Sequence, residues 1–402
     1  MSQARCTLGA PSTGRTFMNA SIHSFSSVPP TALEFFAGIG LARAGLEEAG
    51  FSVAWANDYE PKKYELYSTQ YSSHSDYHIG DIAEVHGEVL PRGSALAWAS
   101  SPCTDLSLAG NRDGLDGAQS GTFWHFIRIL KEMGDDLPPV AVLENVTGLA
   151  SSHSGDDLAA AIRAFNSVGY SVDALSIDAR HFVPQSRPRM FLVAALNPPI
   201  SSDAPSDLRP EWLEWIHTDP TLITHRAALP DVPPLLNAGF SAVADRLSAK
   251  DPHWWDTERT ETFLNSLSPV QSERLRSLRD SSQISYRTAY RRTRNGKPVW
   301  EVRPDDIAGC LRTARGGSSR QAVVKAGKRQ VQIRWMTPHE YATLMGIPDY
   351  NFGNATDNQI RFGFGDAVAV PVVSWLGKNY LMPLVSHRFD EETTQLKAVV
   401  NG

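Results

Sequence analysis

The chain is poor in cysteine, in long apolar runs and in net charge. Its 402 residues include only three cysteines, widely spaced, which argues against a disulfide framework or a metal cluster. We therefore expect a reducing, cytoplasmic environment and no bound metal. No run of about 18 apolar residues occurs, so we expect no membrane span. The net charge of −6 neither favours nor excludes nucleic acid as a partner.

The length and composition are those of an ordinary globular protein with loose ends. A chain of 402 residues, 42% of them hydrophobic, can form one large domain with an insertion, or two domains. The N-terminus lacks the charged-then-apolar pattern of a signal peptide. We expect residues 1–30, rich in Ser, Thr, Pro and Ala, to form a disordered tail, and residues 386–402 to form another.

From residue 31 to residue 196, short apolar runs alternate with helical patterns. This alternation predicts an α/β fold, a parallel sheet with helices on both faces. Ligands of such sheets bind at the carboxyl ends of the strands. The predicted strands are 32–36, 52–57, 95–99, 140–143 and 189–195, and the predicted helices are 40–49, 60–70, 120–132 and 155–167.

Beyond Asn197 the sequence changes character. Prolines become frequent and tryptophans lack periodicity, so we expect a separate, irregular, mostly β or loop region over 197–335. A helix is predicted to resume with Thr337 as N-cap, Pro338 in the first turn and Glu340 three residues after the cap. Residues 361–385 predict another glycine turn and an apolar helix.

A Gly-x-Gly turn follows the first apolar run. Gly38 and Gly40 can turn sharply and bring backbone N–H groups close to a ligand at the start of a helix. Asp58 lies twenty positions after Gly38, where folds of this kind hold a ribose hydroxyl. Arg43 replaces the third glycine of the dinucleotide fingerprint, which argues against a pyrophosphate on the helix. The alternative is a helix-starting turn with no ligand.

Three kinds of reactive side chain lie at the ends of predicted strands: Cys103 and Glu144 follow strands, whereas Arg187 and Arg189 lie at the entry to the strand 189–195. Cys103, after Pro102 and on the glycine-rich loop 104–122, is a candidate nucleophile; the alternative is a packed small side chain. Glu144 emerges from an apolar surround, which predicts a raised pKa; the alternatives are an N-cap and a structural ion pair. Arg187 and Arg189, two residues apart, should project to one face and hold an anion, a carboxylate or a base edge, unless they are simply solvated.

A basic stretch lies near the end of the irregular region. Residues 287–334 contain thirteen Lys and Arg against three acids, and Tyr286 and Tyr290 are interleaved with Arg287, Arg291, Arg292 and Arg294. Such a segment suits a phosphate backbone. The alternative is a solvated basic face.

Taken together, these motifs resemble those of the DNA (cytosine-5) methyltransferases of bacteria and phages, over about residues 31–385. The shared segments, in order, are FAGIG, SPCTDLS, ENV, QSRPR, TPHEYATLMGIPDY and FGFGDAVAVPVV. The resemblance implies a Rossmann-like S-adenosylmethionine-dependent methyltransferase sheet with a smaller, mostly β target recognition domain. The implied divisions are a catalytic and cofactor-binding domain over 31–196, a target recognition domain over 197–335, and a return to the catalytic domain over 336–385.

The resemblance also implies a reaction and the residues that perform it. In this family a cysteine thiolate adds to C6 of a flipped-out cytosine, so that C5 can accept the methyl group of S-adenosyl-L-methionine. Cys103 matches that cysteine. Glu144 matches the glutamic acid that binds the ring N3 and amino group. Arg189, with Arg187 beside it, matches the arginine that holds the base and the glutamate.

Cofactor and DNA contacts are implied in the same way. Phe36 and Tyr59 would meet the adenine, Asp58 the ribose, and Asp81 with Ile82 the adenine edge. The methionine end would meet the backbone of Gly38, Ile39 and Gly40, and the site would be closed by Asp366, Ala367 and Val368. The residues expected to contact DNA are Ser107, Arg291, Arg292, Arg294, Arg312, Arg315 and Arg320.

Some positions depart from the common family pattern. Leu41 stands where many members have glycine, and Thr104 where many have glutamine. The common Gly-Asn-Ser-Val is here Gly-Asp-Ala-Val, residues 365–368. These changes put fine cofactor contacts in question while the chemistry is expected to persist.

Three rival functions stay open at this point. They are an RNA (tRNA) cytosine-5 methyltransferase of the same fold, a nicotinamide-dependent oxidoreductase, and an inactive DNA-binding relative. The expected partner is double-stranded DNA, without a membrane. The family usually acts as a monomer, and a cognate restriction endonuclease would act separately.

Overall fold

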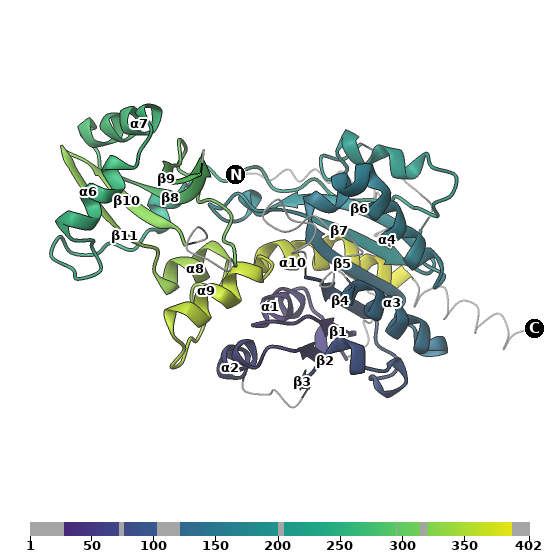
Figure 1. Ribbon diagram of the computed structural model, residues 1–402. Helices are drawn as coiled ribbons and strands as arrows, with labels where there is room; N and C mark the ends of the chain where they lie inside the picture. Colours follow the sequence, from purple (N-terminus) through teal and green to yellow (C-terminus); the bar gives the residue numbers. More distant parts are fainter. Residues whose placement is uncertain are drawn as a thin grey trace, which may run out of the picture.

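A computed structural model describes residues 28–71, 76–102, 121–199, 205–294, 296–313 and 320–387. Within them the chain forms two sheets, a large one of seven strands and a smaller one of four. The two sheets lie at opposite sides of the molecule in Figure 1, with helices from the C-terminal part of the chain between them.

The large sheet carries helices on both faces, as predicted. Alternate residues of its strands enter separate cores: Leu96 and Trp98 join one core, whereas Ala97 and Ala99 join the other. The order is β3-β2-β1-β4-β5-β7-β6. The strands are β1 (Thr31–Phe35), β2 (Ser52–Asp58), β3 (Tyr77–Ile79), β4 (Leu96–Ser100), β5 (Val140–Val146), β6 (Ser171–Asp178) and β7 (Pro188–Ala195). The helices before β6 are α1 (Leu41–Glu48), α2 (Pro61–Gln70), α3 (Thr122–Glu132) and α4 (Asp156–Asn166).

The predicted strands and helices of this region are confirmed, but two strands were missed. β3 is a three-residue edge strand with two exposed residues, too short to show a periodic pattern. β6 carries Asp173 in its middle, a residue that normally argues against a buried strand. Here Asp173 is buried because the guanidinium of Arg209 pairs with it, at 2.6 Å between Nη2 and Oδ2.

The expectation of a purely parallel sheet is wrong in one strand. β7 runs antiparallel to both of its neighbours, β5 and β6. Its first residues therefore lie at the carboxyl edge of β5, with Arg189 opposite Val146. Hydrophobic periodicity fixes which face a strand buries but does not report its direction.

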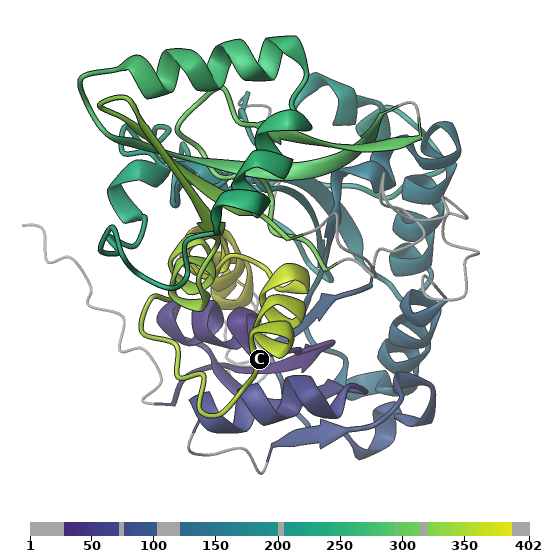
Figure 2. The same cartoon turned by 60° about the vertical axis from the view of Figure 1, so that its left-hand side comes forward.

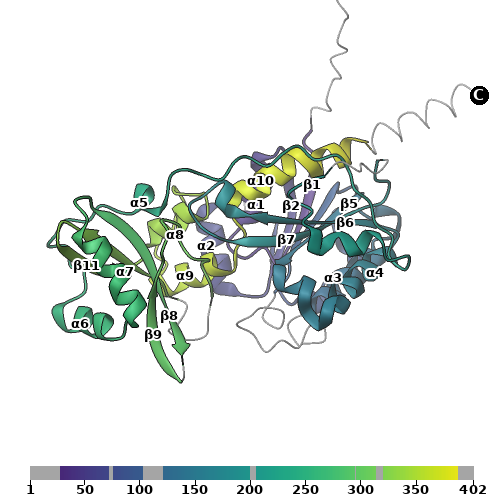
Figure 3. The same cartoon turned by 90° about the horizontal axis from the view of Figure 1, so that it is seen from above.

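The smaller sheet is antiparallel, in the order β11-β10-β8-β9. Its strands are β8 (Ser285–Arg294), β9 (Lys297–Val302), β10 (Ala322–Gly327) and β11 (Gln330–Trp335), and the nearby helices are α5 (Phe240–Val243), α6 (Thr257–Asn265) and α7 (Pro269–Asp280). One face packs on α6 and α7 through Phe263 and Leu275, whereas Tyr286 and Val323 on the other face join a core of the large sheet. Figure 3 shows α6 and α7 on the side turned away from the large sheet.

The residues just after 204 belong with the large sheet. Thr224 forms a bridge with Val172 of β6, and Arg209 bonds both Asp173 and the carbonyl of Ala227. Sequence texture places residues 197–335 in a second domain, and that division stays a prediction. The first strand of the smaller sheet along the chain is β8, which begins at Ser285.

The C-terminal segment returns to the large sheet through α8 (Pro338–Leu344), α9 (Asp357–Asp366) and α10 (Val370–Leu376). The helix start predicted at Thr337 is confirmed, since Thr337 and Glu340 form a reciprocal capping box. Glu340 also pairs with Arg334, and both side chains are fully buried. Figure 2 shows α8 and α9 between the smaller sheet and the α1–α2 side of the large sheet.

The last helical segment is a core element. Asp357–His387 is long and apolar enough to cross a membrane by length and composition, but 67% of its apolar window is buried inside the protein. The segment reaches α1 because Gly45 has no side chain. A Cβ at Gly45 would lie 2.5 Å from Cβ of Val373 and 2.7 Å from the carbonyl oxygen of Val370.

We expect Gly45→Ala to destabilise the protein, because the new methyl group would push α10 away from α1. Overpacking of this kind costs about 1–3 kcal/mol, more than alanine gains over glycine in a helix. Urea unfolding followed by circular dichroism measures the change. Glu48→Ala, at an exposed position of the same helix, serves as control and should change stability by less than about 0.5 kcal/mol. Equal stability of Gly45→Ala and the parent protein would contradict the close helix contact.

Candidate active site

The reactive residues of the large sheet meet at the carboxyl ends of β1, β2, β4 and β5. Glu144 lies near the end of β5, opposite Ser100 of β4 on one side and Phe191 of β7 on the other. Because β7 is antiparallel, its first residues join the same edge. This brings Arg189 to Glu144 although the two are far apart in sequence.

Glu144 and Arg189 form a buried ion pair. Nε of Arg189 lies 3.1 Å from Oε1 of Glu144, and the side chains are 14% and 6% exposed. Burial raises the pKa of Glu144 above its ordinary value, and the nearby charges of Arg189 and Arg187 only partly offset this. The raised pKa agrees with the sequence-based prediction, and a structural ion pair, the stated alternative, is present as well.

Arg187 contacts backbone carbonyls, and its expected part in holding the base stays a prediction. Its guanidinium is buried and donates to the carbonyl of Leu311 at 2.7 Å, to that of Gly365 at 3.1 Å, and to that of Ala367. Burial and the neighbouring charge of Arg189 lower the pKa of Arg187. The donors of Arg187 therefore hold two chain segments together, and Arg189 is the arginine that pairs with Glu144.

Cys310 is a member of this cluster that the sequence did not single out. Its Sγ lies 3.2 Å from Nη1 of Arg187 and 3.9 Å from Nη2 of Arg189. Burial alone would raise the pKa of the thiol, but the charges of Arg187, Arg189 and Arg312 outweigh it and lower the pKa. In the sequence, the only sign of this lowered pKa is that Cys310 lies close to several arginines. Arg187 and Arg189, which contact the thiol, are more than a hundred residues away.

Three of the residues expected to act on DNA lie outside the described residues. They are the candidate nucleophile Cys103, together with Ser107 and Arg315; Thr104, one of the departures from the family pattern, also lies outside. The described chain stops at Pro102, directly after β4, and resumes at Gly121. Ser100, the last residue of β4, is the register partner of Glu144.

The Gly-x-Gly turn has the geometry that the sequence predicts. Gly38 and Gly40 have φ of 57° and 80°, in the left-handed region that favours glycine. The N–H of Gly38 donates to Oδ2 of Asp58 at 3.0 Å, so the acid twenty residues on contacts the turn directly. Arg43, at the position of the missing third glycine, bonds Glu47 and Tyr67 beneath the turn.

Most other expected cofactor residues surround this turn. Asp81 follows β3, and the N–H of Gly80 donates to the carbonyl of Asp58. Tyr59 is 59% exposed. The side chains of Ile39 and Ile82 are buried in the cores, so only their backbone is available to a ligand. The remaining expected residues here are Phe36, Ala367 and Val368, of which Val368 is buried.

Asp366 has an ionic partner that sequence reasoning missed. Nζ of Lys63, in the first turn of α2, lies 3.1 Å from Oδ2 of Asp366 and 3.9 Å from Oδ2 of Asp58. Burial alone would lower the pKa of Lys63, but the two carboxylates outweigh it and raise the pKa. The negative charge that Asp366 adds to the site is therefore balanced.

The basic residues of β8 do not share one face. Arg291 lies over the ring of Trp300, 5.8 Å from its centroid, on the α6–α7 side. Arg292 and Arg294, on the opposite face, both pair with Glu301, at 3.3 Å and 2.7 Å. Alternation along the strand therefore places these three arginines on two faces, and their contact with DNA stays a prediction.

Two further arginines expected to contact DNA differ in their surroundings: Arg320 packs against other side chains, whereas Arg312 is exposed. Arg320 stacks on Trp335 at 4.3 Å and lies 3.6 Å from Asp357. Burial and the charge of Arg361 lower the pKa of Arg320 to about 10. Arg312 is exposed, beside the cluster of Cys310 and Arg189.

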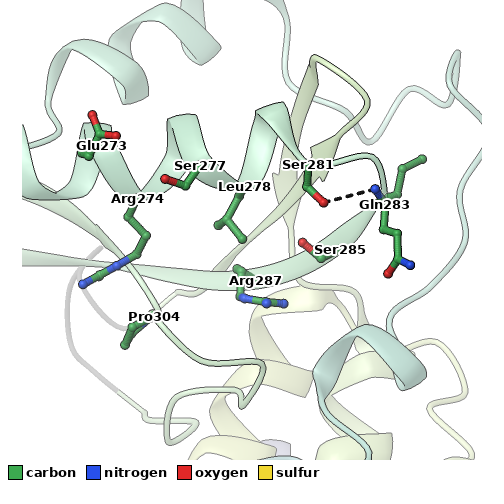
Figure 4. A pocket seen from close by; sticks show the side chains of 10 residues that line it. Glu273, Arg274, Ser277, Leu278, Ser281, Gln283, Ser285, Arg287 and Pro304 are labelled. Atoms are coloured by element: carbon green, nitrogen blue, oxygen red, sulfur yellow. Dashed lines mark hydrogen bonds between the residues drawn. The ribbon is translucent and has the colours of Figure 1, made fainter.

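A groove of about 600 Å³ lies between α7 and β8, away from this chemistry. Figure 4 shows its lining, with the N–H of Gln283 donating to Oγ of Ser281 at 3.1 Å. Its two arginines are already engaged: Arg274 donates to the carbonyl of Val302, and Arg287 pairs with Asp306. The groove therefore offers no free charge and is not the catalytic pocket.

Comparison with known proteins gives a consistent result. A family model described as C-5 cytosine-specific DNA methylase matches residues 31–381. The type II methyltransferase M.HpaII of Haemophilus parainfluenzae is 24% identical over 372 residues, 88% of this chain and 90% of that protein. The type II methyltransferase M.MspI of Moraxella sp is 33% identical over 175 residues, 43% of this chain, and that match spans only 40% of M.MspI. The crystal structure of S. pombe Dnmt2 methyltransferase shares the fold, with a TM-score of 0.57, 17% identity, and coverage of 88% of this chain and 99% of that one.

The raised pKa of Glu144 predicts a pH-dependent effect of Glu144→Gln. A carboxyl whose pKa is raised by folding stabilises the fold below its unfolded pKa, near 4.5, and loses that contribution as pH rises through the folded pKa. The melting temperature of Glu144→Gln, relative to the parent, should therefore increase as pH rises above about 4.5.

Glu132→Gln is the control, because the pKa of Glu132 is shifted in the opposite direction from that of Glu144. Burial would raise the pKa of Glu132, but the N–H of Gly87 and the charge of Arg128 lower it. The advantage of the parent over Glu132→Gln should therefore fade as pH falls below about 4.5. A melting-temperature difference for Glu144→Gln that does not change with pH would contradict the buried, raised-pKa carboxyl.

Proposed function

Because the chain belongs to the C-5 cytosine-specific DNA methylases, matched over residues 31–381, we propose that it methylates C5 of cytosine in double-stranded DNA. S-adenosyl-L-methionine is the proposed methyl donor. The observation that carries the proposal is the buried ion pair of Glu144 and Arg189, 3.1 Å apart, at the end of the strand next to the one that leads to Cys103.

The residues around the Gly-x-Gly turn fit the cofactor. The turn has two glycines with left-handed φ before the start of α1, and the N–H of Gly38 holds Asp58 at the end of the adjacent strand. The proposed assignment places the methionine end at the turn, the ribose at Asp58, and the adenine between Phe36, Tyr59 and Asp81. When bound, the cofactor supplies an electrophilic methyl group.

The proposed chemistry assigns one task to each side chain. The thiolate of Cys103 forms a bond to C6 of the cytosine, and Glu144 supplies a hydrogen bond or proton to N3, so that C5 becomes nucleophilic. Formation of the C5–methyl bond breaks the methyl–sulfur bond. Loss of the C5 proton to a base then breaks the bond between Cys103 and C6 and releases the thiolate.

The electrostatics of Glu144 support this assignment. Burial favours the neutral carboxyl, which can donate to N3, whereas Arg189 keeps the carboxyl oriented and favours its anion. The raised pKa makes this carboxyl a better proton or hydrogen-bond donor to N3 than an ordinary glutamic acid would be. The reacting base must leave the duplex to reach it, because its ring atoms are otherwise stacked.

The proposal extends to DNA binding and assembly. Arg312 is exposed, its charge acts on the thiol of Cys310, and it is proposed to contact a phosphate. We also propose that the protein acts as a monomer and that a cognate restriction endonuclease, where one exists, acts separately. The recognised sequence would be read by residues 197–335.

The reaction is tested by expressing the protein in a host whose DNA lacks cytosine methylation and sequencing that DNA for 5-methylcytosine. The parent should methylate one short motif, Cys103→Ala should methylate nothing, and Glu144→Gln should lose at least about 100-fold. Cys6→Ala, a cysteine outside the matched region, is the control that should retain methylation. Methylation of transfer RNA instead of DNA, or unmodified DNA with a folded protein that binds S-adenosylhomocysteine, would contradict the proposal.

The DNA contact is tested by the salt dependence of binding. Arg312→Ala should weaken binding to duplexes of any sequence and reduce the slope of log K against log salt by about one. Arg279→Ala, an exposed arginine of α7 paired with Asp280, is the control that should leave the slope unchanged. The same slope for Arg312→Ala and the parent would remove Arg312 from the interface.

A further inference from the structure

Lys63 occupies a place in the candidate cofactor site that no sequence motif assigns to it. It belongs to the first turn of α2, and its side chain is only 13% exposed. Its Nζ lies 3.1 Å from Asp366 of α9 and 3.9 Å from Asp58 of β2. A long cation that lies almost out of water needs anionic partners, and here two carboxylates supply them.

The stem of Lys63 passes beside the glycine turn. A Cβ built on Gly38 would lie 3.8 Å from Cδ of Lys63 and 4.0 Å from Oδ2 of Asp58. Under the proposed function, the turn meets the methionine end of the cofactor and Asp58 meets the ribose. The ammonium of Lys63 therefore lies where the amino-acid end and the ribose would join.

A role as a mere strut between α2 and α9 does not account for Lys63. Gln359 of α9 already donates to Glu65 of α2, at 2.8 Å between Nε2 and Oε2, on the exposed side of the same two helices. Lys63 is less exposed, and besides Asp366 of α9 its ammonium lies near Asp58 of β2, which belongs to neither helix. Of its three N–H donors, the contact with Asp366 needs one, and the 3.9 Å separation from Asp58 is too long for a hydrogen bond.

The charges of the site call for a cation. Asp58 and Asp366 lie 3.9 Å and 3.1 Å from the ammonium of Lys63, and Asp366 replaces the asparagine that is common in the family. Both oxygens of Asp58 accept backbone N–H groups, from Gly38 and Glu60. Without Lys63, the two carboxylates would repel the carboxylate end of such a ligand, although they would attract its ammonium.

We propose that Lys63 binds the carboxylate of the amino-acid end of S-adenosylmethionine. In this arrangement Asp366 holds the ammonium of Lys63 in place. This inference rests on the proposed function, because it assumes that cofactor at the glycine turn. Lys63 and Asp366 then act as a matched pair, in which the cation compensates the departure at Asp366 and adds a contact of its own.

The test compares the affinities of three ligands for the parent and for Lys63→Met by calorimetry. S-adenosylhomocysteine carries both the carboxylate and the ammonium. The same thioether with an aminopropyl chain lacks only the carboxylate, and 5′-methylthioadenosine lacks both groups. Lys63→Met should bind S-adenosylhomocysteine at least about tenfold more weakly, in line with the usual strength of a charge-assisted hydrogen bond.

The other two ligands separate a carboxylate contact from a structural effect. Methylthioadenosine should bind both proteins within about twofold, and the aminopropyl thioether should bind Lys63→Met equally well or more tightly, because a repelling cation has gone. Lys62→Met, an exposed neighbour in the same helix turn, is the matched control and should bind all three ligands like the parent.

Two results would overturn the inference about Lys63 alone, and a third would also overturn the proposed cofactor. Equal losses for all three ligands would make Lys63 a strut, and no loss for S-adenosylhomocysteine would remove it from the site; the proposed function would stand in both cases. Failure of the parent protein to bind either S-adenosylhomocysteine or methylthioadenosine would instead overturn the cofactor assignment, and the role of Lys63 with it.

Discussion

The buried guanidinium of Arg187 holds the candidate active site together. It joins the start of β7 to Leu311, which precedes the exposed Arg312, and to Gly365 in the last turn of α9 and Ala367 just after it. A buried cation is tolerated only where its donors are satisfied, and here backbone carbonyls satisfy most of them. Because these carbonyls come from segments more than a hundred residues away, one side chain fixes Arg189, Cys310 and Asp366 relative to one another. The site thus depends on a contact that makes no direct contribution to the proposed chemistry.

Much of this arrangement could be predicted from the sequence, and the failures have physical causes. Periodicity and caps located α1 to α4 and the helix start at Thr337, because these signals are local. The direction of β7 and the burial of Asp173 in β6 could not be predicted, since each depends on a partner elsewhere in the chain. The same holds for Lys63 and Cys310, whose place in the site follows from contacts with Asp366 and Arg189 that the sequence does not reveal. The spacing of Arg187 and Arg189 predicted their common side but not their different partners.

Several arginines on and near the smaller sheet are already paired or stacked, so the sheet offers less positive charge to DNA than its composition implies. Glu301 pairs with Arg292 and Arg294, whereas Arg259 and Arg320 stack on Trp335 at 4.9 Å and 4.3 Å. A count of basic residues therefore overstates the charge available to a phosphate backbone. Arginines that are already stacked or paired keep their geometry fixed, which suits recognition of base edges better than general attraction.

The central claim is that Cys103, and not the acidified thiol of Cys310, attacks the cytosine. It can be tested with a DNA duplex carrying 5-fluorocytosine at the methylated position, incubated with protein and S-adenosylmethionine. The fluorine cannot leave as the proton does, so the cysteine–C6 bond should persist. The account predicts an adduct stable in denaturing gels for the parent and for Cys310→Ser, none for Cys103→Ala, and a DNA-linked peptide that contains Cys103. A linkage mapped to Cys310, or an adduct that survives Cys103→Ala, would contradict it.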